Sequence, residues 1–78
     1  MTRFDMANYE PRPAEVVKLR SRLQKQEEMG ITAAQDYCAA RVYTHRRSWQ
    51  QWERGERRMH PAIWELARIK LGEHPTIA

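Results

Sequence analysis

The sequence lacks the features that would place it in a membrane or in an oxidising compartment. No run of apolar residues is longer than the four at positions 37–40, so we expect neither a membrane-spanning helix nor the apolar core of a secretion signal. The only cysteine is Cys38, which excludes an internal disulfide and favours the reducing cytoplasm. A chain of 78 residues has room for one small domain and little room for a catalytic cleft.

Residue sets that catalyse reactions or hold metals are lacking too. The histidines His45, His60 and His74 have no ligand spacing with Cys38 or with one another, so a zinc site is not expected. The sequence has no Ser/His/Asp set, no glycine-rich phosphate loop and no paired carboxylates. We therefore expect a binding protein and no enzyme, with no cofactor, metal or small-molecule ligand.

The composition is that of a small helical domain. The chain is 41% apolar and 31% charged, with three glycines and four prolines, which is typical of a globular and helix-rich protein. It shows no repeat, no strand-like alternation and no low-complexity segment. Helix start and stop signals predict a compact all-α domain of four helices over residues 13–72. A flexible arm over residues 1–12 precedes this domain, and a tail over residues 73–78 follows it.

Proline, glycine and capping residues mark the ends of the first two helices. The first helix should begin at Pro13 and end before Gly30, with two glutamates that oppose the dipole of its last turn. Its apolar face comprises Val16, Leu19 and Leu23. The second helix is expected over residues 33–42, where Thr32 and Gln35 have the spacing of a capping box.

The third and fourth helices have similar signals. Thr44 or His45 can cap the third helix, and Gly55 ends it. The fourth helix starts at Pro61, which suits the first helical position, and stops at Gly72.

All of the net charge lies in residues 41–58. This segment holds six arginines and two glutamates, a net charge of +4, whereas the rest of the chain is balanced. Every basic residue of the segment is arginine, whose planar fork suits phosphates and guanine edges. The alternative interpretation is a solvated helix face.

The third expected helix carries much of this cluster and follows the second after only about three residues. That arrangement is the geometry of a helix-turn-helix, in which one helix braces the DNA backbone and the next enters the major groove. A central helix-turn-helix is therefore expected within the domain.

The sequences QDYCAARV at residues 35–42, THRRSW at 44–49 and WERG at 52–55 resemble the lambda-repressor-like (Cro/XRE) helix-turn-helix family. The stretch over residues 46–55 is also similar to small regulators of phages and mobile elements. Among these are the anti-CRISPR-associated repressors, which share the Ser-Trp-Gln and Trp-Glu-x-Gly features. The resemblance covers roughly residues 14–72.

The resemblance implies which residues contact DNA. The residues matching base-contacting positions are Arg46, Arg47 and Gln51. Those expected at the DNA backbone are Gln35, Ser48, Gln50, Arg54, Arg57 and Arg58. Solvent is an equal alternative for Gln50. Arg47 and Gln51 stand four residues apart and so share one helix face more squarely than Arg46 and Gln51 do.

The resemblance also assigns a core. Ala39 matches the small residue where two helices cross, and the matching core positions are Cys38, Val42 and Trp49. Trp52 and Trp64 are interpreted as core residues as well, rather than as platforms for bases. Glu53 is interpreted as the ion-pair partner of Arg41 or Arg57. Tyr43 stands where the family prefers glycine, and a positive φ there costs a non-glycine residue about 1 kcal/mol.

Together these features predict a sequence-specific regulator of transcription that binds double-stranded DNA, most simply a repressor. One such domain covers a short half-site, so a homodimer on an inverted repeat is expected. The fourth helix is the expected dimer contact, because Trp64, Ile69 and Leu71 should not all fit into one small core. Two alternatives stay open: a protein-binding inhibitor, such as an antitoxin or host-defence antagonist, and an excisionase-like protein that bends DNA.

Overall fold

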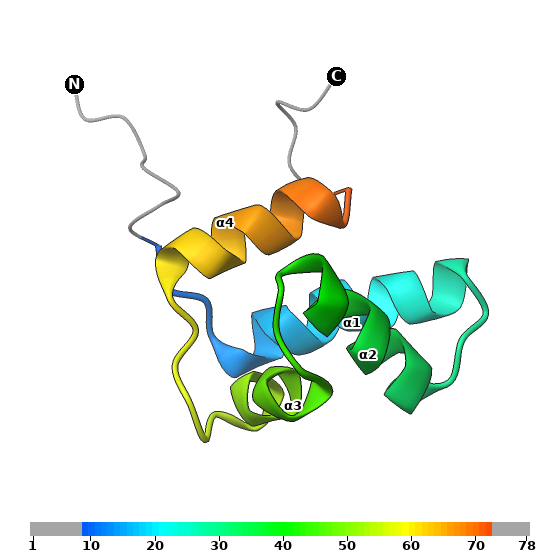
Figure 1. Cartoon of the computed structure of the whole chain (residues 1–78), viewed down its shortest axis with the longest axis horizontal. Coiled ribbons are helices and arrows are strands. Elements are labelled where there is room, and N and C mark those ends of the chain that lie inside the picture. Colours follow the sequence, from blue (N-terminus) through cyan, green and yellow to red (C-terminus); the bar gives the residue numbers. More distant parts are fainter. Residues whose placement is uncertain (1–8, 73–78) are drawn as a thin grey trace.

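Four helices make up the part of the chain that this computed structural model describes, residues 9–72. They are α1 (Pro13–Gln26), α2 (Ile31–Arg41), α3 (Arg46–Arg54) and α4 (Pro61–Lys70). No strand occurs within these residues, which confirms the predicted all-α class. In Figure 1, α3 and α4 lie on opposite sides of the molecule, with α1 and α2 between them. None of the described helices has the length and apolar character needed to cross a membrane.

The core takes side chains from all four helices and from the α3–α4 connection. Its buried members are Val16, Leu19, Leu23, Cys38, Ala39, Val42, Trp49, Trp52, Met59, Trp64, Ala67 and Leu71. The predicted apolar face of the first helix and the core role of the three tryptophans are thus confirmed. The rings of Trp49 and Trp52 meet edge to face with their centroids 5.8 Å apart, an arrangement that aromatic pairs prefer. Burial raises the pKa of the Cys38 thiol to about 12, so this cysteine is an uncharged core residue.

α1 begins at Pro13, as predicted, but it ends at Gln26, well before Gly30. Glu27 and Glu28 follow the last helical residue, and Glu28 has a left-handed backbone with φ of 54°. Negative charge at this end of a helix opposes its dipole, and the helix stops before both glutamates.

α2 begins at Ile31, two residues earlier than predicted, with Gly30 as its N-cap. The carbonyl of Gly30 accepts the first helical hydrogen bond from the N–H of Ala34, at 3.0 Å. The predicted capping box is therefore wrong, because Thr32 already lies inside the first turn. The side chain of Gln35 is buried and has other partners.

The limits of α3 and α4 follow the prolines and glycines. Gly55 ends α3 with a left-handed φ of 75°. His45 is the N-cap of α3, but its side chain makes no capping hydrogen bond. Pro61 is the first residue of α4, and Nδ1 of His60 accepts the N–H two residues further on, at 3.0 Å. Gly72, with φ of 86°, follows the end of α4.

Residues 9–12, which the sequence assigns to a flexible arm, lie against the helices. The hydroxyl of Tyr9 donates to the carboxylate of Glu15 at 2.7 Å, and the ring of Tyr9 packs on the core. The carboxylate of Glu10 accepts two hydrogen bonds from Arg58, at 2.7 and 2.9 Å. The first eight residues of the expected arm, and the expected tail over 73–78, lie outside the described residues.

Candidate nucleic-acid interface

α2 and α3 pack closely and are joined by the four residues 42–45. Backbone hydrogen bonds hold this turn, from Tyr43 N–H to the Ala40 carbonyl at 3.1 Å and from Thr44 N–H to the Ala39 carbonyl at 3.0 Å. Tyr43 takes a left-handed φ of 61°, which reverses the chain direction in little space. Ala39 is buried, and its small side chain lets the neighbouring elements approach closely.

A buried carboxylate ties α3 to α1 and α2. The two carboxylate oxygens of Glu53 accept hydrogen bonds from Nε and Nη2 of Arg20 at 2.8 and 2.9 Å, which makes the ion pair bidentate. They also accept from Nε2 of Gln35 at 3.0 Å and from Nε1 of Trp49 at 2.7 Å. The side chains of Arg20 and Glu53 are only 10% and 7% exposed. We call these four residues the Glu53 network. It fixes the inward side of α3 against two other helices.

The partner predicted for Glu53 is therefore wrong, although its structural role is right. Arg41 instead lies over the ring of Tyr37, and Arg57 donates to Ser48. Arg20 was missed because a charged residue was not expected in the core. Its signal in the sequence is its position four residues after Val16, within the apolar stripe of α1.

The Glu53 network makes folding sensitive to acid. Burial alone would raise the pKa of Glu53, but the hydrogen bonds from Arg20, Gln35 and Trp49 and the charge of Arg20 bring it below the ordinary value of 4.5. A carboxyl whose pKa is lowered by folding stabilises the native state above its ordinary pKa and loses that contribution as the pH falls through the lowered pKa. We expect the free energy of unfolding to decline below about pH 4.5.

Urea unfolding followed at several pH values would measure this decline. Glu53→Gln should flatten it substantially. Glu10→Gln is the matched control and should flatten the decline less. The pKa of Glu10 is also lowered, chiefly by its hydrogen bond to Arg58, but Glu10 lies at the surface. Equal flattening by both variants would contradict the assignment to Glu53.

The side of α3 opposite the core faces outward. Trp49 and Trp52 point into the core, and each helical residue advances by about 100°. Arg47, Gln51 and Arg54 therefore share the outer side, where both arginines are exposed and Gln51 is partly exposed. Arg47 has no ion-pair partner among residues 9–72. Two of the three predicted base contacts thus lie together on one outward face.

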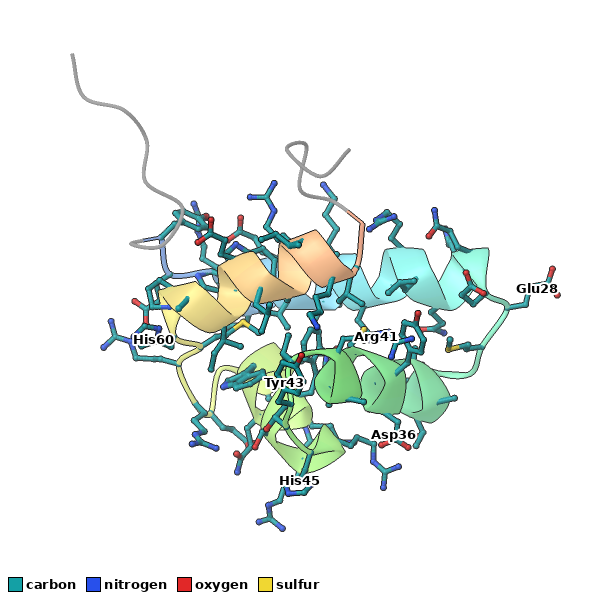
Figure 2. All side chains as sticks on the ribbon, turned by 45° about the horizontal axis from the view of Figure 1, so that its top comes forward. Glu28, Asp36, Arg41, Tyr43, His45 and His60 are labelled. Atoms are coloured by element: carbon teal, nitrogen blue, oxygen red, sulfur yellow. The ribbon has the colours of Figure 1, made fainter. Side chains whose placement is uncertain are left out.

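Arg46, the third predicted base contact, lies at the edge between α3 and α2. Its Nη1 is 3.1 Å from Oδ2 of Asp36, and the two side chains are 43% and 57% exposed. Asp36 and His45 mark this edge of the molecule in Figure 2. Because only one nitrogen of Arg46 is hydrogen-bonded, the guanidinium keeps donors for another partner.

Gln35 and Gln50, two of the predicted phosphate contacts, form hydrogen bonds within the protein instead of pointing outward. Nε2 of Gln50 donates to Oε1 of Gln35 at 3.1 Å, while the amide nitrogen of Gln35 donates to Glu53. Gln35 is 7% exposed. Both amides therefore extend the brace between α2 and α3 rather than projecting from it.

The other predicted phosphate contacts are Ser48 in the first turn of α3, Arg54 at its end, and Arg57 and Arg58 in the connection that follows. Nη1 of Arg57 lies 3.3 Å from Oγ of Ser48. Arg54 is 3.9 Å from Glu56, a long and exposed ion pair. Arg58 is turned toward Glu10. Of these three arginines, Arg58 has the closest carboxylate partner, at 2.7 Å.

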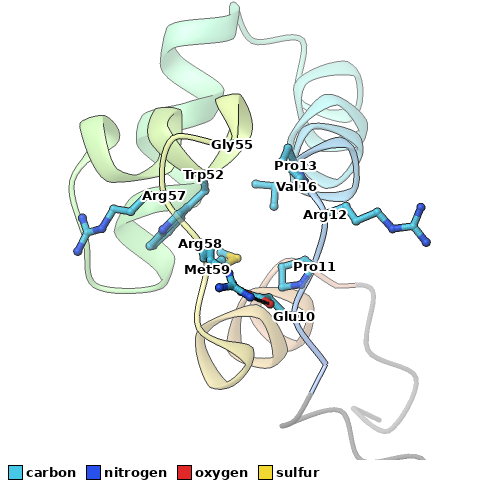
Figure 3. Close-up of a pocket in the computed structure, with 10 residues that line it drawn as sticks. All are labelled: Glu10, Pro11, Arg12, Pro13, Val16, Trp52, Gly55, Arg57, Arg58 and Met59. Carbon is cyan, nitrogen blue, oxygen red and sulfur yellow. Dashed lines mark hydrogen bonds and ion pairs between the residues drawn. The ribbon is translucent and has the colours of Figure 1, made fainter.

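A cavity of about 250 Å³ lies between residues 10–13 and the α3–α4 connection. Figure 3 shows the Glu10–Arg58 pair at this cavity, whereas the guanidinium groups of Arg12 and Arg57 point away from it. Val16, Trp52 and Met59 contribute apolar lining but are almost completely buried. The cavity therefore offers little apolar surface to a ligand.

The expected dimer contact on the fourth helix is not supported by burial. Trp64 and Leu71 are 4% and 5% exposed within the chain itself, and only Ile69 is partly exposed. Both buried side chains fit into the core because α4 packs across the end of the molecule opposite α3. Of the three predicted residues, Ile69 alone offers side-chain surface to a partner.

No three His, Cys, Asp or Glu side chains within the described part of the chain group together as metal ligands. No protein-family model, curated protein or solved structure matches the chain. Its own residues therefore have to carry any assignment of function.

Proposed function

We propose that this protein is a sequence-specific regulator that binds double-stranded DNA with α3 in the major groove. The observation that carries the proposal is the division of α3 into two sides. Its inner side is fixed by buried tryptophans and the Glu53 network, and its outer side presents Arg47, Gln51 and Arg54. Because the backbone of α3 is already fixed, binding would have to order these side chains but not the helix that carries them. The four-residue connection to α2 suits a helix-turn-helix.

The residue chemistry suits base reading and phosphate binding. Arg47 matches the two acceptors on the guanine edge, and Gln51 matches the acceptor and donor of adenine. Arg54 and Arg57 at the end of α3 would bind phosphates and set the register. Gln35 and Gln50 would act through their hydrogen bond, by keeping α2 and α3 in place.

Repression by a homodimer is part of this proposal. A single helix in the groove reads only a short half-site, so two copies on an inverted repeat would supply the affinity that a repressor needs. Because Trp64 and Leu71 are buried in the core, the proposed dimer would be organised by surface residues and by the spacing of the half-sites.

Selection of bound sequences from a random duplex library tests the proposal as a whole. Enrichment of an inverted repeat would support a dimer that reads sequence, and enrichment of a single half-site would support a monomer. Equally weak, salt-sensitive binding to all duplexes would contradict specific recognition. The slope of log K against log salt, about −0.9 per neutralised phosphate, would count the backbone contacts.

Arg47→Ala is expected to weaken binding to the selected duplex by about 1–3 kcal/mol, with a smaller loss on scrambled DNA. Fluorescence anisotropy at fixed salt measures both affinities. Lys25→Ala, which removes one exposed positive charge from α1, is the matched control and should change both affinities little. Equal losses in the two variants would show that Arg47 contributes only its charge.

A further inference from the structure

A second surface combines two tyrosines with two cations. The guanidinium carbon of Arg41, at the end of α2, lies 4.1 Å from the ring centroid of Tyr37. Nζ of Lys70, at the end of α4, donates a 2.8 Å hydrogen bond to the hydroxyl of Tyr43 and lies 4.8 Å from its ring centroid. We call these four residues the tyrosine–cation surface. In Figure 2, Arg41 and Tyr43 face the viewer beside α4, whereas Asp36 and His45 mark the lower edge.

The turn between α2 and α3 needs a left-handed backbone at residue 43, but it does not need the exposed tyrosine side chain that stands there. The left-handed φ of 61° at Tyr43 disfavours every residue with a Cβ, and glycine would make the same turn without strain. Its side chain is not part of the core, because the residue is 77% exposed. Backbone strain combined with an exposed aromatic ring points to a role in recognition.

The two cations of this surface have no acidic partner within the described part of the chain. Neither Arg41 nor Lys70 forms an ion pair with any residue from 9 to 72. Both cations contact an aromatic ring, and such contacts orient them without neutralising their charge. The surface therefore attracts anionic groups.

Apolar side chains continue the surface along α4. Leu66 precedes Lys70 by four residues and Ile63 by seven, so the three share one side of the helix. Leu66 and Ile63 are only partly buried and pack against the core. A phosphodiester backbone is polar and would gain little from contact with these apolar side chains. Protein interfaces, by contrast, combine apolar contact with tyrosine and arginine anchors.

We propose that the tyrosine–cation surface docks an acidic segment of a partner protein. Arg41 binds one carboxylate of the segment through two parallel hydrogen bonds. Lys70 and the hydroxyl of Tyr43 bind a second carboxylate, and an apolar side chain of the segment lies against Leu66. This inference does not depend on DNA binding by α3.

A random-peptide display selection on the immobilised full chain tests the proposal. The expected winners combine Asp or Glu with Leu or an aromatic residue. A fluorescent copy of the best peptide should bind at least about tenfold more weakly to Tyr43→Gly and to Lys70→Gln. Lys25→Gln removes the same charge from an exposed position on α1, and this variant should bind the peptide normally. Tyr43→Gly relieves backbone strain, so its melting temperature should not fall.

Three results would overturn the proposal. Selection of peptides without acidic residues, or of peptides whose binding survives both substitutions, would show that this surface is not an acidic-segment site. A salt titration with duplex DNA provides the second arm. If Lys70→Gln reduced the slope of log K against log salt by about 0.9, the surface would be a phosphate contact instead. Failure of all DNA binding would leave the peptide result unaffected.

Discussion

Replacing Glu53 by alanine is expected to lower the free energy of unfolding by about 3–5 kcal/mol, because the buried Arg20 would lose its charged partner. The variant would also leave the donors of Gln35 and Trp49 without their acceptor. Small domains are stable by only about 0.05–0.15 kcal/mol per residue, so this loss is comparable to the whole stability of the fold. Urea unfolding followed by far-ultraviolet circular dichroism measures it.

Two further variants separate the ion pair from a general effect of losing a carboxylate. Glu56→Ala removes an exposed glutamate whose ion-pair distance is 3.9 Å, and its effect should stay within about 0.5 kcal/mol. The double variant Arg20→Met with Glu53→Leu replaces both buried charges by apolar groups and should be more stable than Glu53→Ala alone. Equal losses in Glu53→Ala and Glu56→Ala would show that the pair does not stabilise the fold.

Trp49→Ala is expected to cost about 3–5 kcal/mol, because it removes the largest fully buried side chain and leaves a cavity. The indole also donates a 2.7 Å hydrogen bond to Glu53 and contacts the ring of Trp52. Trp49→Phe keeps much of the volume but not the donor, so it should cost less than the alanine variant. The same urea experiment measures both.

The control for Trp49 is an exposed apolar residue. Ile31 is 54% exposed, and Ile31→Ala should therefore change the free energy of unfolding little. If Trp49→Ala were no more destabilising than Ile31→Ala, the indole would not be the centre of the core. A loss in Trp49→Phe as large as that in Trp49→Ala would assign the stability to the hydrogen bond rather than to packing.

The helices could be predicted because their signals are local. Pro13 and Pro61 fix φ at the first helical position, and Gly55 supplies a left-handed stop, whatever the rest of the chain does. The N-terminus of α2 could not be predicted in the same way. Gly30 starts it through its backbone alone, and no side-chain pattern marks that event.

The pairings between helices could not be predicted, because they depend on how the helices cross. Arg20 and Glu53 are 33 positions apart, and Glu10 and Arg58 are 48 apart. Charge alone points to Arg41 or Arg57 as the partner of Glu53, because it carries no information on how α1 crosses α3. Periodicity also does not reveal how many of the apolar side chains of the fourth helix the core can hold, because the capacity of the core depends on the packing of all four helices.

The two-sided construction of α3 has a consequence for how this protein could acquire new targets. The side chains at 47, 51 and 54 do not hold the helix in place, because burial and the Glu53 network act on its other side. If α3 reads DNA as proposed, substitutions at these positions would change the bases it reads while leaving the contacts that hold the helix unchanged. Recognition and stability would then depend on different faces of the same nine residues.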